Sequence, residues 1–184
     1  MNKGLAVVLV VVGLLAFGSI GMYNSLQSAK IEVEAQYGQV ENQIQRRADL
    51  IPNLVATVKG YTQHEEKVLT EITNARAKVM NAGSATEMAE ADAALTGALG
   101  RLIAVAENYP NLKADAHFTE LMREVAGSEN RIAVARKDYN AAIRDYNVSV
   151  STFPGNFFAG MMGFRPMPAF AADEAAHAVP QVAF

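Results

Sequence analysis

The part of the chain that decides the fold is residues 33–61, VEAQYGQVENQIQRRADLIPNLVATVKGY. Apolar side chains recur here at alternating steps of four and three, with glutamate, glutamine and asparagine between them. The apolar positions are Val33, Tyr37, Val40, Ile44, Ile51, Leu54, Val58 and Tyr61. That spacing places them along one side of a helix, so it predicts a long amphipathic helix of a bundle. Pro52 removes one backbone donor, and because the periodicity continues past it we expect a kink rather than an end.

An uncharged run of twenty residues, GLAVVLVVVGLLAFGSIGMY, precedes this helix at Gly4–Tyr23. At about 1.5 Å per residue such a helix spans the ~30 Å hydrocarbon core of a bilayer, which predicts a single transmembrane anchor. A cleavable signal peptide is the alternative, because Lys3 supplies a short basic region and Ser19-Ile20-Gly21 resembles a cleavage site. The length of the run favours the retained anchor. Nearly balanced positive charges on its two sides leave the orientation open.

Three more helices are predicted after Tyr61. Two of them begin at sequences with the spacing of a capping box, Thr62 with Glu65 and Ser84 with Glu87. The last begins between Asn111 and Phe118 and ends at Phe153-Pro154-Gly155. Their apolar faces are Val68, Leu69, Ile72, Val79 and Met80; Met88, Leu95, Leu99, Leu102 and Ile103; and Phe118, Leu121, Val125, Ile132, Tyr139, Ile143, Tyr146, Val150 and Phe153.

The predicted fold class is all-α, with an N-terminal transmembrane helix followed by a long antiparallel four-helix bundle, because short loops favour antiparallel neighbours. The expected organisation is an anchor at 1–23, the bundle at 24–153 and a Gly-, Pro-, Phe- and Met-rich segment at 154–184. Because four antiparallel helices follow the anchor, the last of them ends on the side of the bundle that faces the bilayer. The apolar residues of this last segment are Phe157, Phe158, Met161, Met162, Phe164 and Phe170. They lie at the membrane surface or against the anchor in one interpretation, and cap the open end of the bundle core in the other.

Arg47 is the most informative polar residue, because it occupies a position of the apolar stripe between Ile44 and Ile51. A buried charge needs a partner. If the first and last helices are antiparallel, equal rise per residue brings Arg47 level with Glu129. We therefore predict an Arg47–Glu129 ion pair inside the bundle. The alternative is that the Arg47 side chain packs its stem on its neighbours and extends its charge to solvent.

The sequence offers little for catalysis or for a cofactor. A net charge of −3 argues against nucleic acid as a partner, and the absence of cysteine excludes thiolate chemistry. His64-Glu65 begins like a zinc protease motif, but the second histidine is replaced by Val68, and His117 and His177 suggest no shared site. Glycine-rich nucleotide loops and the GxSxG elbow are absent. We predict no catalytic, cofactor or metal site, and a protein that is not an enzyme.

Longer stretches of the chain closely resemble the LemA family. They are Tyr23-Asn24, QRRADLIPNLVATVKGY, His64-Glu65, Ala75-Arg76, PNLKADAHF, SENRIAVARKDYN, YNVSVSTFP and Gly163-Phe164, in the family's order. The resemblance implies a single-pass bacterial membrane protein with a long four-helix bundle and an undefined biochemical role. It also implies an association with membrane stress and with neighbouring proteases, and it carries no catalytic residues.

The function predicted from the sequence is a membrane-anchored scaffold or adaptor of the bacterial cell envelope, in the inner membrane. Its expected partners are membrane lipid around the N-terminal helix, further copies of the chain, and a membrane protein such as a protease. A ligand- or lipid-binding envelope module is the alternative, followed by an enzyme with an unrecognised site. A concave aromatic cleft would favour the first of these, and a deep pocket with two perturbed ionisable groups the second.

Overall fold

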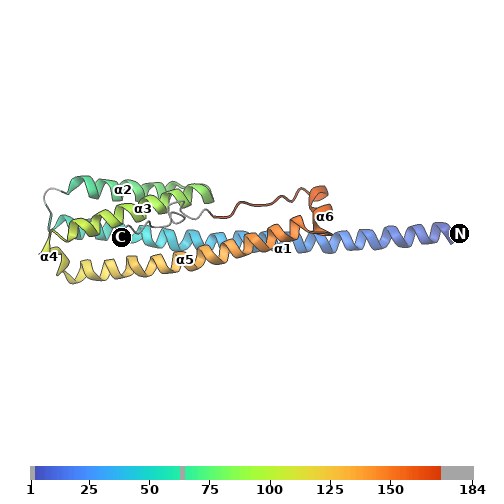
Figure 1. Cartoon of the computed structure of the whole chain (residues 1–184), viewed down its shortest axis with the longest axis horizontal. Helices are drawn as coiled ribbons and strands as arrows, with labels where there is room; N and C mark the ends of the chain where they lie inside the picture. The colour runs from blue at the N-terminus through green and yellow to red at the C-terminus, as the bar shows by residue number, and fades with distance from the viewer. Residues whose placement is uncertain (1–2, 63–64, 171–184) are drawn as a thin grey trace, which may run out of the picture. The chain divides into compact units, whose positions relative to one another are not determined.

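The computed structural model describes residues 3–62 and 65–170, without the side chains of residues 3, 6, 8, 11 and 14–16 (Figure 1). Six helices follow one another: α1 (Lys3–Lys59), α2 (Glu66–Asn81), α3 (Ala85–Ala106), α4 (Pro110–Lys113), α5 (Ala116–Ser151) and α6 (Gly155–Met162). No strand occurs in these residues, so the all-α prediction is confirmed. Among the described residues no helix meets the length and apolarity that a bilayer crossing requires. The predicted anchor, Gly4–Tyr23, falls partly on side chains outside that description.

The chain divides into two compact units. In the described part, the first comprises residues 3–36 and 138–169, and the second comprises residues 37–62, 65–137 and 170. The two long helices α1 and α5 contribute residues to both units, so the divisions fall inside helices and not at the loops. The predicted organisation into anchor, bundle and C-terminal segment stays a prediction.

The second unit has its core where the apolar periodicity places it. Helices α2 and α3 pack side by side (Figure 1). Buried positions of this core are Val40, Ile44, Ile51, Leu54 and Val58; Leu69, Ile72 and Val79; Met88, Leu95, Leu99 and Leu102; and Phe118, Val125 and Ile132. Met80 and Ile103 are about half exposed, at 48% and 47%, so their prediction as core residues was wrong. Each follows a buried residue, and one step along a helix turns a side chain away by roughly 100°.

The two predicted capping boxes have different outcomes. At α3 the Ser84 cap is confirmed, because the Glu87 backbone N–H donates to Ser84 Oγ at 3.2 Å; the reciprocal bond shifts by one residue, since the Glu87 carboxylate accepts from the Gly83 N–H at 2.8 Å. At α2 it was wrong, because the helix begins at Glu66 and the Thr62 hydroxyl donates backward to the Val58 carbonyl at 3.1 Å. The last carbonyls of a helix lack intrahelical donors, so a nearby hydroxyl can bond them instead of capping the next helix.

Helix α5 begins inside the predicted window, at an aspartate cap. The Phe118 N–H donates to Asp115 Oδ1 at 2.8 Å, and the Tyr61 hydroxyl donates to Asp115 Oδ2 at 2.7 Å. The Phe118 N–H, and then the Tyr61 hydroxyl, lower the pKa of the Asp115 carboxyl below its ordinary 3.8. The helix ends at Ser151, and Phe153 is 86% exposed, so the expectation that Phe153 joins the apolar face was wrong.

In the first unit, α1 and α5 bury apolar residues and the chain beyond α6 lies on α5. The buried side chains include Leu26, Val33, Ile143, Tyr146 and Val150. Downstream of α6, the Tyr146 hydroxyl donates to the Arg165 carbonyl at 3.0 Å. The Asn147 amide both donates to and accepts from the Met167 backbone, each at 2.8 Å. Two side chains of α5 therefore hold this segment by its backbone.

Helix α1 continues through Pro52 because a neighbouring helix replaces the missing donor. Proline has no N–H to donate to the carbonyl four residues earlier, which belongs to Ala48. In the second unit Arg76 Nε of α2 donates to that carbonyl at 3.1 Å. The Pro52 side chain is exposed. A local defect of α1 is thus repaired by a hydrogen bond from α2.

We expect Arg76→Met to lower the free energy of unfolding by about 1–2 kcal/mol, because the Ala48 carbonyl then has no donor. In a Pro52→Ala background the restored N–H at position 52 bonds that carbonyl, so the same Arg76→Met change should cost much less. Urea unfolding followed by circular dichroism measures all four combinations, with the exposed Arg131→Met as control. Equal costs in both backgrounds would show that the Arg76 bond does not compensate for the proline.

Candidate functional site

A buried guanidinium lies at the centre of the second unit. Periodicity places Arg47 on the same side of α1 as Ile44 and Ile51, and its exposed fraction is 1%. Within the core its Nη1 bonds Glu129 Oε2 of α5, and its Nη2 bonds Asp92 Oδ1 of α3. The Nη2 atom also donates to the Asp92 carbonyl at 3.2 Å. The two residues that helix register brings level in the sequence, Arg47 and Glu129, are therefore in contact, and the charge does not extend to solvent.

The more deeply buried partner, Asp92, is the residue that the sequence reasoning missed. Its side chain is 2% exposed, whereas that of Glu129 is 48% exposed. The signal for it was present, because Asp92 lies four residues after Met88 and three before Leu95, inside an apolar stripe. This is the same signal that identified Arg47. A buried acid on one helix and a buried base on another predict each other.

The cluster contains a second cation. Arg136 Nη1 of α5 lies 3.7 Å from Asp92 Oδ2, so the aspartate carboxylate faces two guanidinium groups. Burial raises the pKa of Asp92 above its ordinary 3.8 and Glu129 adds to that rise, while Arg47 and Arg136 act in the opposite direction. In the described structure, Arg47 Nε and Gln43 Oε1 are buried without a hydrogen-bond partner. The cluster sets the register of α1, α3 and α5 and presents no unengaged base to a substrate.

The Arg136 guanidinium also contacts the end of the described chain. Its central carbon lies 4.6 Å from the centroid of the Phe170 ring, in the geometry of a cation–π contact. Phe170 is only 5% exposed. Phe170 therefore does not lie exposed at a membrane surface, because its ring is buried against a cation of α5.

The other apolar residues predicted near the membrane separate into two groups. Phe157 and Met161 are 63% and 74% exposed. Phe158, Met162 and Phe164 are half-buried. Residues 171–184 of the predicted C-terminal segment lie outside the described residues.

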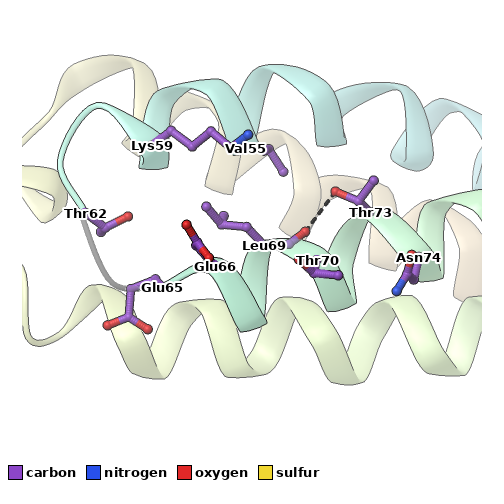
Figure 2. Close-up of a pocket in the computed structure, with 9 residues that line it drawn as sticks. All are labelled: Val55, Lys59, Thr62, Glu65, Glu66, Leu69, Thr70, Thr73 and Asn74. Carbon is purple, nitrogen blue, oxygen red and sulfur yellow. Dashed lines mark hydrogen bonds between the residues drawn. The ribbon is translucent and has the colours of Figure 1, made fainter.

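A cleft of about 540 Å³ lies between the end of α1 and the start of α2 in the second unit (Figure 2). It is lined by Val55, Lys59, Thr62, Glu65, Glu66, Leu69, Thr70, Thr73 and Asn74. Several of its polar groups already have partners: the Thr73 hydroxyl donates to the Leu69 carbonyl at 2.8 Å, and Glu65 accepts from the Tyr109 hydroxyl at 3.0 Å. The described lining includes no aromatic ring. The cleft therefore offers aliphatic and charged groups to a ligand.

Of the three histidines, the structure describes one. His117 is exposed at the start of α5, and His64 and His177 lie outside the description. No group of three or more metal-ligating side chains is found in the part of the chain that the structure describes.

Residues 36–184 match the sequence model of the LemA family. Magnetosome proteins MamQ 1 and MamQ 2 of Paramagnetospirillum magneticum are each 29% identical to the chain over 169 residues, covering 78% of it and 62% of their own length. Protein LemA of Metamycoplasma hominis is 24% identical over 164 residues, covering 89% of this chain and 75% of its own. The chain thus spans less than two thirds of the length of these two MamQ relatives.

We expect Arg47→Met to lower the free energy of unfolding by about 3–5 kcal/mol, because it leaves Asp92 buried with only the weaker 3.7 Å pair to Arg136. The double variant Arg47→Met/Asp92→Leu should recover most of that loss, since it replaces the pair with apolar groups. Urea unfolding followed by circular dichroism measures the four-variant cycle.

The matched control for this cycle is Arg101→Met, which removes a cation from the exposed pair with Glu71 at 2.7 Å. That change should cost less than about 1 kcal/mol. If Arg47→Met costs no more than the control, or if the effects of Arg47→Met and Asp92→Leu are additive, the cluster does not set the register of the core.

Proposed function

This chain belongs to the LemA family, and we propose that it is a membrane-anchored helical scaffold of the bacterial cell envelope. One N-terminal helix holds it in the inner membrane, and it acts by binding copies of itself or other proteins, without catalysis. The observation that carries the proposal is the continuity of α1 from Lys3 to Lys59. The uncharged run Gly4–Tyr23 and the apolar stripe of the core belong to one helix, so the anchor and the core are joined without a linker.

The exposure of the N-terminal side chains supports the anchor. Large apolar side chains are exposed along the described part of the run, at Leu5, Val7, Leu9, Val10, Val12, Phe17 and Ile20, with exposed fractions between 53% and 80%. A contiguous apolar surface of this kind is costly in water and favourable in lipid. A bilayer covers all sides of such a helix at once.

Apolar side chains are also exposed on the helices of the second unit, where a scaffold would meet its partners. Ile103 of α3 is 47% exposed and Val134 of α5 is 59% exposed. Single exposed apolar residues are common on any surface, so their role depends on what they contact in the cell. Further copies of the chain, and a membrane protein such as a protease, are the partners that we propose.

The ligand-binding alternative has one specific observation in its favour, the cleft between α1 and α2. Its volume of about 540 Å³ is within the usual range of small-molecule sites. Its charged lining at Lys59, Glu65 and Glu66 suits a polar ligand better than a lipid chain. An enzyme with an unrecognised site remains the third proposal.

We expect the full chain to stay with membranes after alkaline carbonate extraction of bacterial cells. The double variant Leu9→Arg/Val12→Arg should appear in the supernatant or be degraded, because each arginine at the centre of a spanning helix costs about 2.5–3.5 kcal/mol. Ile31→Arg is the matched control, since Ile31 is a 53% exposed apolar residue of the same helix beyond the run. Extraction of the unchanged protein, or unchanged retention of the double variant, would contradict the anchor.

We expect a photo-reactive amino acid at position 103 or 134 to capture copies of the chain or a discrete membrane protein in intact cells. The same residue at the buried position of Ile132 serves as control and should capture neither. Mass spectrometry of the adducts identifies the partner and the face that binds it. Capture of lipid alone, at both exposed positions, would contradict the scaffold proposal and favour a lipid- or ligand-directed role.

A further inference from the structure

Helix α6 buries two small residues and exposes two of its four large apolar residues. Gly155 and Ala159, four residues apart, are buried, whereas Phe157 and Met161, also four residues apart, are 63% and 74% exposed. A surface helix of a soluble domain turns its large apolar residues toward the core. In α6 only Phe158 and Met162 are half-buried, and Phe157 and Met161 face outward.

The orientation of α6 is fixed by the backbone. A Cβ at position 155 would lie 1.9 Å from the Ser149 carbonyl oxygen of α5, so only glycine allows the helix to begin this close to α5. At the other end Gly163 adopts φ +77°, and the Phe164 N–H donates to the Ala159 carbonyl at 3.0 Å. The helix therefore cannot simply rotate to bury Phe157 and Met161.

The position of α6 along the first unit is given by one aromatic contact. The Phe164 ring lies 5.8 Å from the Tyr23 ring, with an interplanar angle of 61°. Tyr23 ends the strongly apolar part of α1, because the polar residues Asn24 and Ser25 follow it, and tyrosine is enriched where helices leave the hydrocarbon core. The chain directly after α6 thus contacts α1 at the boundary of the proposed anchor.

The charge pattern around α6 also suits lipid. Residues 146–164 contain no Asp, Glu, Lys or Arg, and Arg165 follows directly as an exposed cation. Phe153, just before the helix, is 86% exposed and extends the apolar surface. Burying this stretch at the edge of a bilayer removes no charge from water, and Arg165 is placed to meet lipid phosphates.

We propose that α6 is an interfacial helix, which inserts Phe153, Phe157 and Met161 into the bilayer beside the anchor. The inference rests on the proposed anchor, because the Tyr23–Phe164 contact places α6 at a membrane only if residues 4–23 cross it. As an interfacial helix, α6 would attach the first unit to the membrane at a second point. One spanning helix is free to rotate about its axis, whereas α6 held at the boundary fixes which side of the first unit faces the lipid.

The chain contains no cysteine, so single-cysteine variants can be labelled without altering other sites. We expect an environment-sensitive NBD label at Met161→Cys or Phe157→Cys to shift its emission to the blue in nanodiscs of phosphatidylcholine and phosphatidylglycerol. Lipids brominated near the top of the acyl chain should then quench it. The same label at Val134→Cys, an exposed residue of the second unit, should show neither effect. Circular dichroism checks that each variant keeps its helical content.

A label at Val10→Cys separates the two proposals, because it reports the anchor independently. Quenching at position 10 by lipids brominated deep in the chain, without quenching at positions 157 and 161, would overturn the interfacial helix and leave the anchor standing. A blue shift at 157 and 161 that bromine does not quench would show that protein, such as a second copy, covers this face, and would also overturn it. No quenching at any of the three positions would overturn both proposals.

Discussion

The bonding of one buried guanidinium is the constraint on which the core of the second unit depends. Arg47 is 1% exposed and carries a charge that would cost several kcal/mol if it stayed unpaired. Its partners come from two other helices, Asp92 of α3 and Glu129 of α5. A shift of one helical turn in either helix would separate a carboxylate from the guanidinium. Apolar contacts tolerate such shifts more readily than a buried ion pair does, so this cluster makes the alignment of three helices specific.

Helix α1 shows the same dependence on neighbours at the level of the backbone. Proline inside a helix leaves one carbonyl without a donor, and at Ala48 that donor is Arg76 of α2. The repair lets a single helix extend from Lys3 to Lys59. Continuity matters for the proposed function, because the uncharged run and the apolar stripe of the core then belong to one helix. A break at Pro52 would place a flexible point inside that core.

In the C-terminal region, composition predicted the apolar character of the residues but not their secondary structure. The apolar character of Phe157 and Met161 was plain in the sequence, but the helix that carries them was not predicted. Glycine and proline near both ends suggested irregular structure. In the structure those glycines have a different role, because Gly155 lets α6 approach α5 closely and Gly163 ends the helix. The exposure of the large side chains follows from that approach, which needs the Ser149 carbonyl of α5 to be in place.

The sequence by itself determined the features that repeat along a helix: the all-α class, the apolar stripes, the Ser84 cap, and the charge that interrupts a stripe at Arg47. These depend on residues three or four positions apart, so local order is enough to reveal them. Helix register also brought Arg47 level with Glu129, but the tertiary structure decided the other partners that meet across helices. In the structure Asp92 pairs with Arg47, and the Thr62 hydroxyl donates to a carbonyl of α1. The Phe170 ring is buried against the Arg136 guanidinium. The physical reason is that a polar or aromatic side chain bonds the partner that surrounding helices bring within reach. The spacing of residues within one helix does not specify the distance to side chains of another helix.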